Sequence, residues 1–172
     1  WEDSARLAMP YAIEHHKHRL AAWAASRATS VKGCRFKVEE GVAILQSSGF
    51  DSEFSPDALP APAQIEKAHE EWRNLVIHNA TELGMKFSHG VAAKLINCYL
   101  KVRFVCGGCH ADERVKSLHP PIDDLLLKEL AERNFGEEAR QWRKFRQLRW
   151  SKFDSETYES VVSLIRRTLP PG

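Results

Sequence analysis

Long apolar runs are missing from this chain of 172 residues. Apolar stretches such as 125–127 and 161–162 are far shorter than the roughly 20 residues needed to cross a bilayer. The pattern of a secretory signal is missing as well. We therefore expect no membrane association and a cytoplasmic location.

Cysteine is scarce, and the charge is nearly balanced. The four cysteines do not form the framework of a secreted disulfide-rich domain, since only Cys106 and Cys109 lie close in sequence. The 25 basic and 23 acidic side chains leave a formal net charge of only +2. Overall charge therefore does not indicate a nucleic-acid-binding protein, and the local distribution of charge has to decide.

The alternation of apolar and polar residues that is typical of strands is also missing, and helical spacing takes its place. The first expected helix, for example, carries Ile13, Leu20, Trp23 and Ala24 on one face. The sequence predicts an all-α fold with helices over residues 10–29, 38–48, 63–83, 90–105, 120–133, 136–150 and 155–169.

The expected organisation is a single compact unit over residues 9–172 that acts as a monomer. Residues 55–62 hold three prolines and predict a linker, near which two closely packed lobes would divide. Residues 106–117 are polar and contain two adjacent glycines, so we expect a loop there. Residues 1–8 precede a Met-Pro pair and are interpreted as an extension or tag.

Two successive helix starts carry side chains that suit a chemical role. A helix is expected to stop at Gly84, a tight turn contains Gly90, and Lys94 lies one turn into the next helix. Free backbone N–H groups at such a start favour a phosphate. Asp123 is expected in the first turn of the following helix, where the dipole favours a carboxylate. The two side chains would then meet across a cleft.

This arrangement resembles the helix-hairpin-helix DNA glycosylase superfamily, in particular its 8-oxoguanine glycosylase branch. That family carries a G-V-G-x-K hairpin and then a V-P-V-D segment that opens the next helix. Residues 90–94 (G-V-A-A-K) and 121–123 (P-I-D) match these motifs, with Ala92 in place of the second glycine. The spacing from Lys94 to Asp123 is longer than in the family, and residues 106–117 account for it as an insertion.

The resemblance implies a base-excision enzyme acting on double-stranded DNA. We expect no cofactor and no bound metal. Asp123 would stabilise the positive charge that develops on the sugar when the glycosidic bond breaks. Lys94 would attack C1′ and form a Schiff base, which permits strand cleavage; if it only contacts a phosphate, the enzyme is monofunctional. The target base has to leave the stack first. An oxidised purine or a hypermodified phage base is the expected target.

The expected DNA-binding residues come from the hairpin and from a basic helix. The helix over residues 140–152 is rich in arginine and lysine and contains Trp142, Phe145 and Trp150. The alternative is an amphipathic helix with a wet basic face and aromatic residues in the core. The DNA-binding set is Ser88, His89, Gly90, Ala92, Arg143, Lys144, Arg146, Arg149 and Lys152.

Two further groups are weaker candidates. The side chains of Cys106, Cys109 and His110, with His119 further along the chain, could bind zinc. A structural zinc site needs four well-spaced ligands, however, and only the two cysteines form a close pair. A loop that contacts DNA or a partner is the alternative. Three residues of the first helix are candidates for the base pocket, although Trp23 also suits a core position: His16, Arg19 and Trp23.

Two other functions stay open from the sequence. The same hairpin and basic helix would serve a non-catalytic helix-hairpin-helix module that binds DNA phosphates. A helical protein-interaction domain, in which Lys94 and Asp123 are ordinary surface residues, is the third interpretation.

Overall fold

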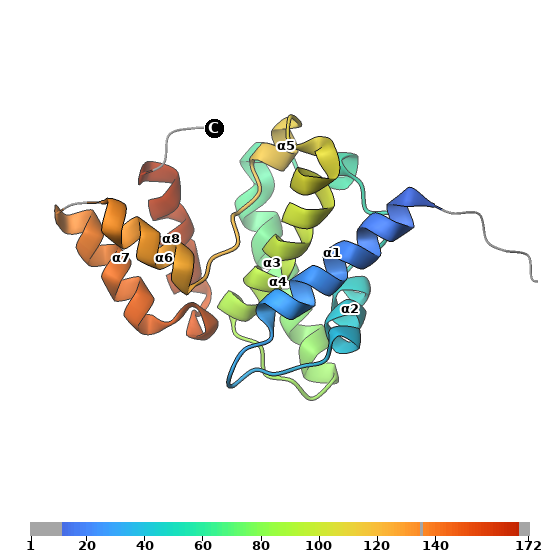
Figure 1. Cartoon of the computed structure of the whole chain (residues 1–172), viewed down its shortest axis with the longest axis horizontal. Helices are drawn as coiled ribbons and strands as arrows, with labels where there is room; N and C mark the ends of the chain where they lie inside the picture. The colour runs from blue at the N-terminus through green and yellow to red at the C-terminus, as the bar shows by residue number, and fades with distance from the viewer. Residues whose placement is uncertain (1–11, 135, 169–172) are drawn as a thin grey trace, which may run out of the picture.

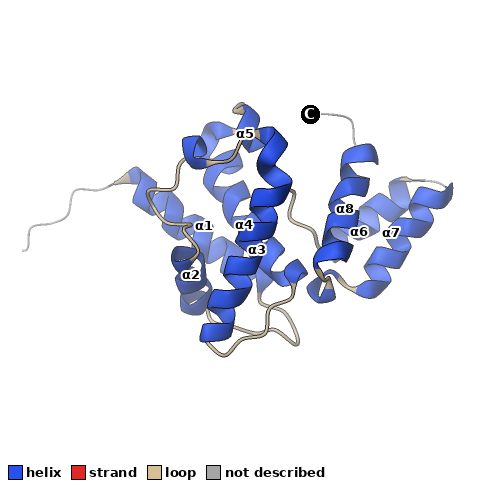
Figure 2. Cartoon of the chain, turned by 180° about the vertical axis from the view of Figure 1, so that it is seen from behind, coloured by secondary structure: helices blue, strands red, loops and turns tan. Residues whose placement is uncertain are grey.

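The computed structural model describes residues 12–134 and 136–168, and this part of the chain is all-α, as predicted (Figure 2). The interpretation of residues 1–8, the helix start at Pro10 and the helix end at Leu169 fall outside the described residues. The α-helices are α1 (Ile13–Thr29), α2 (Val38–Ser47), α3 (Ile65–Glu82), α4 (His89–Leu100), α5 (Glu113–Lys116), α6 (Asp124–Arg133), α7 (Gly136–Leu148) and α8 (Ser155–Thr168). None of the described helices is long and apolar enough to span a membrane.

The helices form two groups that lie side by side (Figure 1). Helices α1 to α5 make up the larger group, and α6, α7 and α8 make up the smaller one. The segment over residues 117–123 joins them. Residues 55–62 contain 3₁₀ turns at Pro56–Ala58 and at the start of Pro62–Gln64 and lie within the larger group, so the visible division does not fall there.

Helix α4 is the centre of the larger group. Its side chains are buried nearly all round, from Gly90 to Leu100, because α1 and α3 pack against it. Ser88 begins the helix, and its hydroxyl accepts a hydrogen bond of 3.1 Å from the amide of Val91. Most of these buried side chains are apolar, as expected for a helix in a core, although Lys94 and Asn97 are buried among them.

The buried face of helix α1 is opposite to the face that carries its large apolar residues, which the sequence had predicted to be buried. The face that packs inward carries small side chains at Ala21, Ala22 and Ala25, which allow close approach. Leu20 and Trp23 are each about half exposed. The prediction of the buried face was therefore wrong, because side-chain size, rather than hydrophobicity alone, decides how closely two helices approach.

Helix α3 ends as predicted, since Gly84 has φ +75°, in the left-handed region that glycine favours. Its inner face holds Val76 and Ala80, but also the fully buried polar residues His69 and Arg73. The hydrophobic pattern did not indicate this polar part of the core.

The expected loop over residues 106–117 is largely helical. Helix α4 continues as a π-helical stretch, Lys101–Cys109, near whose end Gly108 has φ +96°. Asp112 then begins the short helix α5, its carboxylate accepting from the amides of Arg114 and Val115. The loop prediction was wrong over these residues, because the Asp112 cap and the burial of Val115 outweigh the two glycines.

In the smaller group, α8 begins where predicted, with the Asp154 carboxylate accepting a 2.8 Å hydrogen bond from the amide of Thr157. Trp142 of α7 is fully buried, as its core interpretation predicts. Helix α7 ends at Leu148, two residues before the predicted end, and Arg149 follows with φ +64°.

Candidate active site at the junction of the helical groups

Lys94 and Asp123 meet where the two groups of helices join. The amine of Lys94, on α4, donates a hydrogen bond of 3.3 Å to Oδ2 of Asp123, which precedes α6. The Lys94 side chain is 10% exposed and that of Asp123 is 32% exposed. The structure thus brings the sequence-predicted pair together, with the amine enclosed and the carboxylate open to solvent.

Asp123 is the N-cap of α6 rather than a residue of its first turn. Its Oδ1 accepts a hydrogen bond of 3.0 Å from the amide of Leu126, while Oδ2 faces Lys94. Both oxygens are therefore engaged, and the carboxylate is fixed in orientation.

Trp150 covers the Lys94 amine. The nitrogen lies 4.3 Å from the centroid of the indole ring, which is a cation–π contact, and Trp150 is itself 9% exposed. Cys98 lies one turn beyond Lys94 on α4; burial raises the pKa of its thiol, and the positive charge of Lys94 opposes that rise. The pair is thus bordered by an aromatic ring and a neutral thiol.

The start of α4 is closed by the protein itself. The amide of Gly90 donates a hydrogen bond of 3.1 Å to the carbonyl of Phe153, and the amide of Val91 is bonded to Ser88. A side chain at position 90 would collide with the carbonyl oxygen of Trp150. Gly90 and Ala92 are buried, so the prediction that these hairpin amides are free to bind a phosphate is wrong. Close packing against residues 150–153, rather than contact with DNA, explains why residue 90 is a glycine.

The other two hairpin residues lie nearer the surface. The Ser88 hydroxyl donates a hydrogen bond of 2.9 Å to the carbonyl of Ser151, which ties the hairpin to the turn that carries Trp150. His89 is partly buried, and its burial lowers the pKa of the imidazole.

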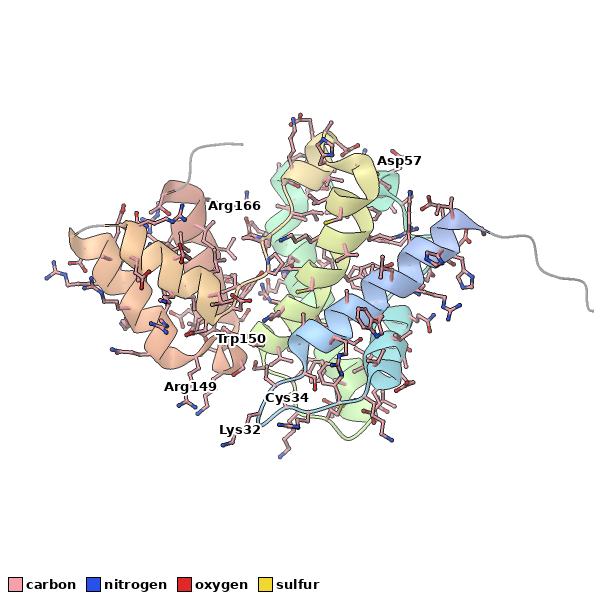
Figure 3. The ribbon with its side chains drawn as sticks, in the orientation of Figure 1. Lys32, Cys34, Asp57, Arg149, Trp150 and Arg166 are labelled. Atoms are coloured by element: carbon pink, nitrogen blue, oxygen red, sulfur yellow. The ribbon has the colours of Figure 1, made fainter. Side chains whose placement is uncertain are left out.

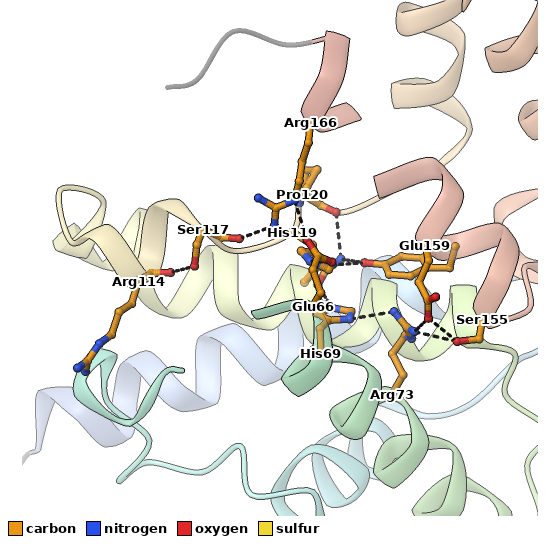
Figure 4. Close-up of polar contacts among 12 residues, drawn as sticks. Glu66, His69, Arg73, Arg114, Ser117, His119, Pro120, Ser155, Glu159 and Arg166 are labelled. Atoms are coloured by element: carbon orange, nitrogen blue, oxygen red, sulfur yellow. Dashed lines mark hydrogen bonds and ion pairs between the residues drawn. The ribbon is translucent and has the colours of Figure 1, made fainter. Parts of the chain in front are cut away.

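A buried polar cluster joins the two groups (Figure 4). Asn97 of α4 donates 3.0 Å hydrogen bonds to the Tyr158 hydroxyl and to the carbonyl of Pro120. The rings of His69 and His119 stack with their centroids 4.2 Å apart. Burial lowers the pKa of His69 well below its ordinary value and raises that of Tyr158. The cluster fixes the segment that leads into Asp123.

Arg73 extends this cluster to α8. Its guanidinium is buried and lies 2.8 Å from Glu159 and 3.0 Å from the Ser155 hydroxyl (Figure 4). It also stacks over the Tyr158 ring, 4.5 Å from the centroid. None of these polar core residues was expected from the sequence, because a histidine or arginine on a helix gives no signal of its partner on a distant element.

The basic residues of the predicted helix over residues 140–152 differ in their partners and in their distance from the junction. Arg146 is bound to Asp124 through two hydrogen bonds, of 2.8 Å and 3.1 Å. Arg143 and Lys144 are exposed on α7. Arg149 and Lys152 are also exposed, and they flank Trp150, which covers Lys94.

The three base-pocket candidates lie away from the pair. His16, Arg19 and Trp23 are exposed on α1, on the opposite side of the helix from the face that packs inward. Trp23 is neither a core residue nor close to the junction. The structure therefore does not bring these residues to Lys94.

The structure adds basic residues that sequence reasoning missed. The loop over residues 30–37 contacts the hairpin through Cys34, whose Sγ lies 3.8 Å from the carbonyl of Lys86, and through ring contact of Phe36 with Phe87. Figure 3 shows Lys32 and Cys34 on the same edge as Arg149 and Trp150. We give the name cationic edge to the exposed basic residues of this loop, of the hairpin that it contacts and of the turn that carries Trp150: Lys32, Arg35, Lys37, Lys86, Arg149 and Lys152.

The cationic edge is free to bind an anion. None of its six side chains forms an ion pair with another described residue. A cavity of about 310 Å³ lies beside the loop, lined by Arg27, Lys32, Arg35 and Lys37, and none of its described lining residues is acidic. The sequence signal was the presence of three basic residues, Lys32, Arg35 and Lys37, within six positions outside any expected helix.

Within the described residues, no group of three or more histidine, cysteine, aspartate or glutamate side chains is arranged to hold a metal ion. Cys106, Cys109 and His110 lie at the end of the π-helical stretch, whereas His119 is buried in the polar cluster. Comparisons of the chain with protein-family models, with curated proteins and with solved structures give no match.

Proposed function

We propose that this chain is a DNA glycosylase that excises a damaged or modified base, and that Lys94 and Asp123 carry the chemistry. The observation that supports this most strongly is the 3.3 Å contact between an enclosed amine and an oriented carboxylate. An amine and a carboxylate at one site suit attack on a sugar carbon and stabilisation of the charge that develops there.

The cationic edge supports DNA as the substrate. Arg149 and Lys152 flank Trp150, and the loop that carries Lys32, Arg35 and Lys37 contacts the hairpin that leads to Lys94. A phosphate backbone bound along these segments would pass the reactive pair. The target nucleotide would have to leave the duplex to reach Lys94. Trp150 would have to move away from the amine as the sugar enters.

In the proposed reaction, the Lys94 ammonium first gives a proton to solvent, and its nitrogen then forms a bond to C1′. The bond from C1′ to the base breaks, and the base leaves with the bonding electrons and takes up a proton. Asp123 stabilises the positive charge on the sugar meanwhile. The C1′–O4′ bond then breaks as O4′ takes the proton that the attached nitrogen loses, which leaves a Schiff base. Loss of a proton from C2′ to solvent and departure of the 3′ phosphate with its bonding electrons cut the strand.

The test uses duplexes that carry a panel of oxidised purines and bulkier modified bases, together with borohydride, which reduces a Schiff base to a stable adduct. We expect release of at least one base and a trapped adduct that Lys94→Ala abolishes. Asp123→Asn should lower excision about 100-fold or more while DNA binding persists. Lys67→Ala, at an exposed lysine of α3, is the matched control and should leave both unchanged. Normal excision by both site variants would refute the proposal.

The second candidate is a non-catalytic DNA-binding module. The enclosure of Lys94 beneath Trp150 favours it, because a side chain that is 10% exposed can serve simply to hold the junction together. In that case the chain binds duplex DNA with a steep salt dependence, no base of the panel is released and no adduct forms.

A further inference from the structure

A cavity of about 300 Å³ lies beside the π-helical stretch. One wall is formed by Lys101 and Val105, and another by Pro120 and Pro121, which precede Asp123. The segment that closes it is the one that lengthens the spacing between Lys94 and Asp123, and it contributes His110 and Lys116. The inserted residues 106–117 therefore form part of the wall of a cavity.

The lining of this cavity combines apolar walls with positive charge. Val105 and the two prolines present flat or branched apolar surface, whereas Lys101 and Lys116 carry amines. None of the described residues that line it carries a carboxylate. Lys101 has no ion-pair partner among the described residues, and Lys116 pairs only with the exposed Glu113, at 2.7 Å. An exposed pair of this kind is weak, so Lys116 remains able to bind a stronger anion.

The cavity is close to the reactive pair along the chain and along the helix. Lys101 lies two turns after Lys94, on the same face, which is about 10 Å along the helix axis. Pro121 is separated from Asp123 by a single residue. A ligand in the cavity is therefore within one or two nucleotides of a sugar at Lys94.

We propose that this cavity binds a nucleoside monophosphate group, with the base against Val105 and the prolines and the phosphate between Lys101, His110 and Lys116. The choice of a nucleotide over another ring-bearing anion rests on the proposed function. Apolar walls with a few convergent polar groups are what a ring-bearing ligand needs, and ammonium groups bind phosphate through charge-assisted hydrogen bonds. The group comes either from a nucleotide of the bound strand or from a free nucleotide.

Calorimetric titration with deoxyadenosine monophosphate tests the site, with deoxyadenosine and inorganic phosphate as partial ligands. We expect the monophosphate to bind more tightly than either part, and Lys101→Gln and Lys116→Gln each to weaken it about three- to fivefold. Lys128→Gln, on α6, is the matched control and should change nothing, since Lys128 does not line the cavity. Equal binding of the nucleoside and its monophosphate, or equal effects of the three variants, would overturn the proposal.

A second pair of variants separates charge from shape. Val105→Asp and Val105→Asn differ by one charge at a partly exposed position, so both should fold, and only the aspartate should repel the phosphate. We expect weaker binding for Asp than for Asn; equal affinities would contradict the proposal.

Competition with a single-stranded oligonucleotide identifies the source of the nucleotide. Displacement of the monophosphate by the oligonucleotide assigns the site to the bound strand, and its persistence assigns the site to a free nucleotide. Borohydride trapping at Lys94 in the unsubstituted protein reports on the proposed chemistry by itself. A normal adduct in a protein that binds no monophosphate would reject the cavity proposal and leave the proposed function standing.

Discussion

The amide of Gly90 and the carbonyl of Phe153 form a hydrogen bond of 3.1 Å that ties the first turn of α4 to the turn carrying Trp150. This contact requires a residue without a side chain, because a Cβ at position 90 would collide with the carbonyl of Trp150. Close approach of the two backbones at this point holds the indole ring over Lys94.

Gly90→Ala should therefore destabilise the protein by about 2 kcal/mol, because the backbone at residue 90 or at Trp150 would have to move to make room for the methyl group. Chemical denaturation monitored by circular dichroism measures the free energy of unfolding. The control is Gly107→Ala, where the nearest atom, the carbonyl oxygen of Val102, lies at an ordinary 3.7 Å. A Gly90→Ala protein as stable as the Gly107→Ala protein would show that the close contact is not rigid.

Substitutions of Asp123 should separate its structural role from its chemical one. Asp123→Ala removes the cap of α6 and should cost about 1 kcal/mol of stability, whereas Asp123→Asn keeps a capping oxygen and should cost less. Excision, in contrast, should fall in both variants, because both lose the negative charge beside Lys94. Thermal unfolding and base release, measured on the same preparations, test the two effects. If stability and excision fall in parallel across the two variants, capping alone explains the residue.

Stability should fall as the pH is lowered from 7.5 to 5.5. Burial, followed by the charges of His119 and Arg73, lowers the pKa of His69 well below its ordinary value, and burial also lowers those of His18 and His89. Below pH 6.5 the unfolded chain therefore binds protons that the native protein does not, and the free energy of unfolding decreases with acid.

The slope should approach about 1.4 kcal/mol per pH unit for each histidine that stays neutral in the native state. Urea titrations at pH 7.5, 6.5 and 5.5 measure it. His69→Gln should make the slope shallower, whereas His78→Gln, at an exposed position of α3, should leave it unchanged. An unaltered slope in His69→Gln would show that this imidazole is protonated in the native protein.

Neutralising the cationic edge should weaken duplex binding and reduce its dependence on salt. Lys32→Gln, Arg35→Gln and Lys86→Gln should each lower the magnitude of the slope of log K against log salt by about 0.9 for every phosphate that the variant no longer neutralises. Fluorescence anisotropy with a labelled duplex at several salt concentrations measures this slope. Arg133→Gln, on α6 and paired with Glu129, is the control that should leave it unaltered. Slopes that match the unsubstituted protein in all three variants would place the DNA elsewhere.

Arg149 should lower the stability of the folded protein and strengthen its binding to DNA. Its φ of +64° is a left-handed conformation that costs a residue with a side chain roughly 1 kcal/mol, so Arg149→Gly should fold at least as stably as the parent chain. The same change removes a cation beside Trp150 and should weaken DNA binding, which Arg149→Lys should restore. Denaturation and anisotropy measurements on both variants test this. A destabilised Arg149→Gly protein would contradict the interpretation of the backbone geometry.

The sequence predicted the all-α class and most helix ends, because these depend on local signals. Gly84 ends α3, and Asp154 begins α8, through conformational and capping preferences that a few neighbouring residues determine. The meeting of Lys94 with Asp123 was also predicted, since each lies at a helix start in a motif of recognisable order.

Other features depend on distant partners and could not be predicted. Trp23 suits a core position by its chemistry, but Ala21, Ala22 and Ala25 let α1 approach α4 more closely. The open helix start expected at Gly90 is closed by Phe153, which lies on another element. Local patterns predict which segments are helical, whereas the partner on each face follows from packing of the whole chain.

The double engagement of Asp123 has a consequence for how this site would change in evolution. Loss of this aspartate would harm the folding of α6 even in a descendant that no longer performed any reaction, because Oδ1 holds the helix start. Its retention in a descendant would thus say little about activity. Among the described residues, the Lys94 amine caps no helix; it forms an ion pair with Asp123 and a cation–π contact with Trp150, so its replacement would be the clearer sign that a lineage does not use the proposed chemistry.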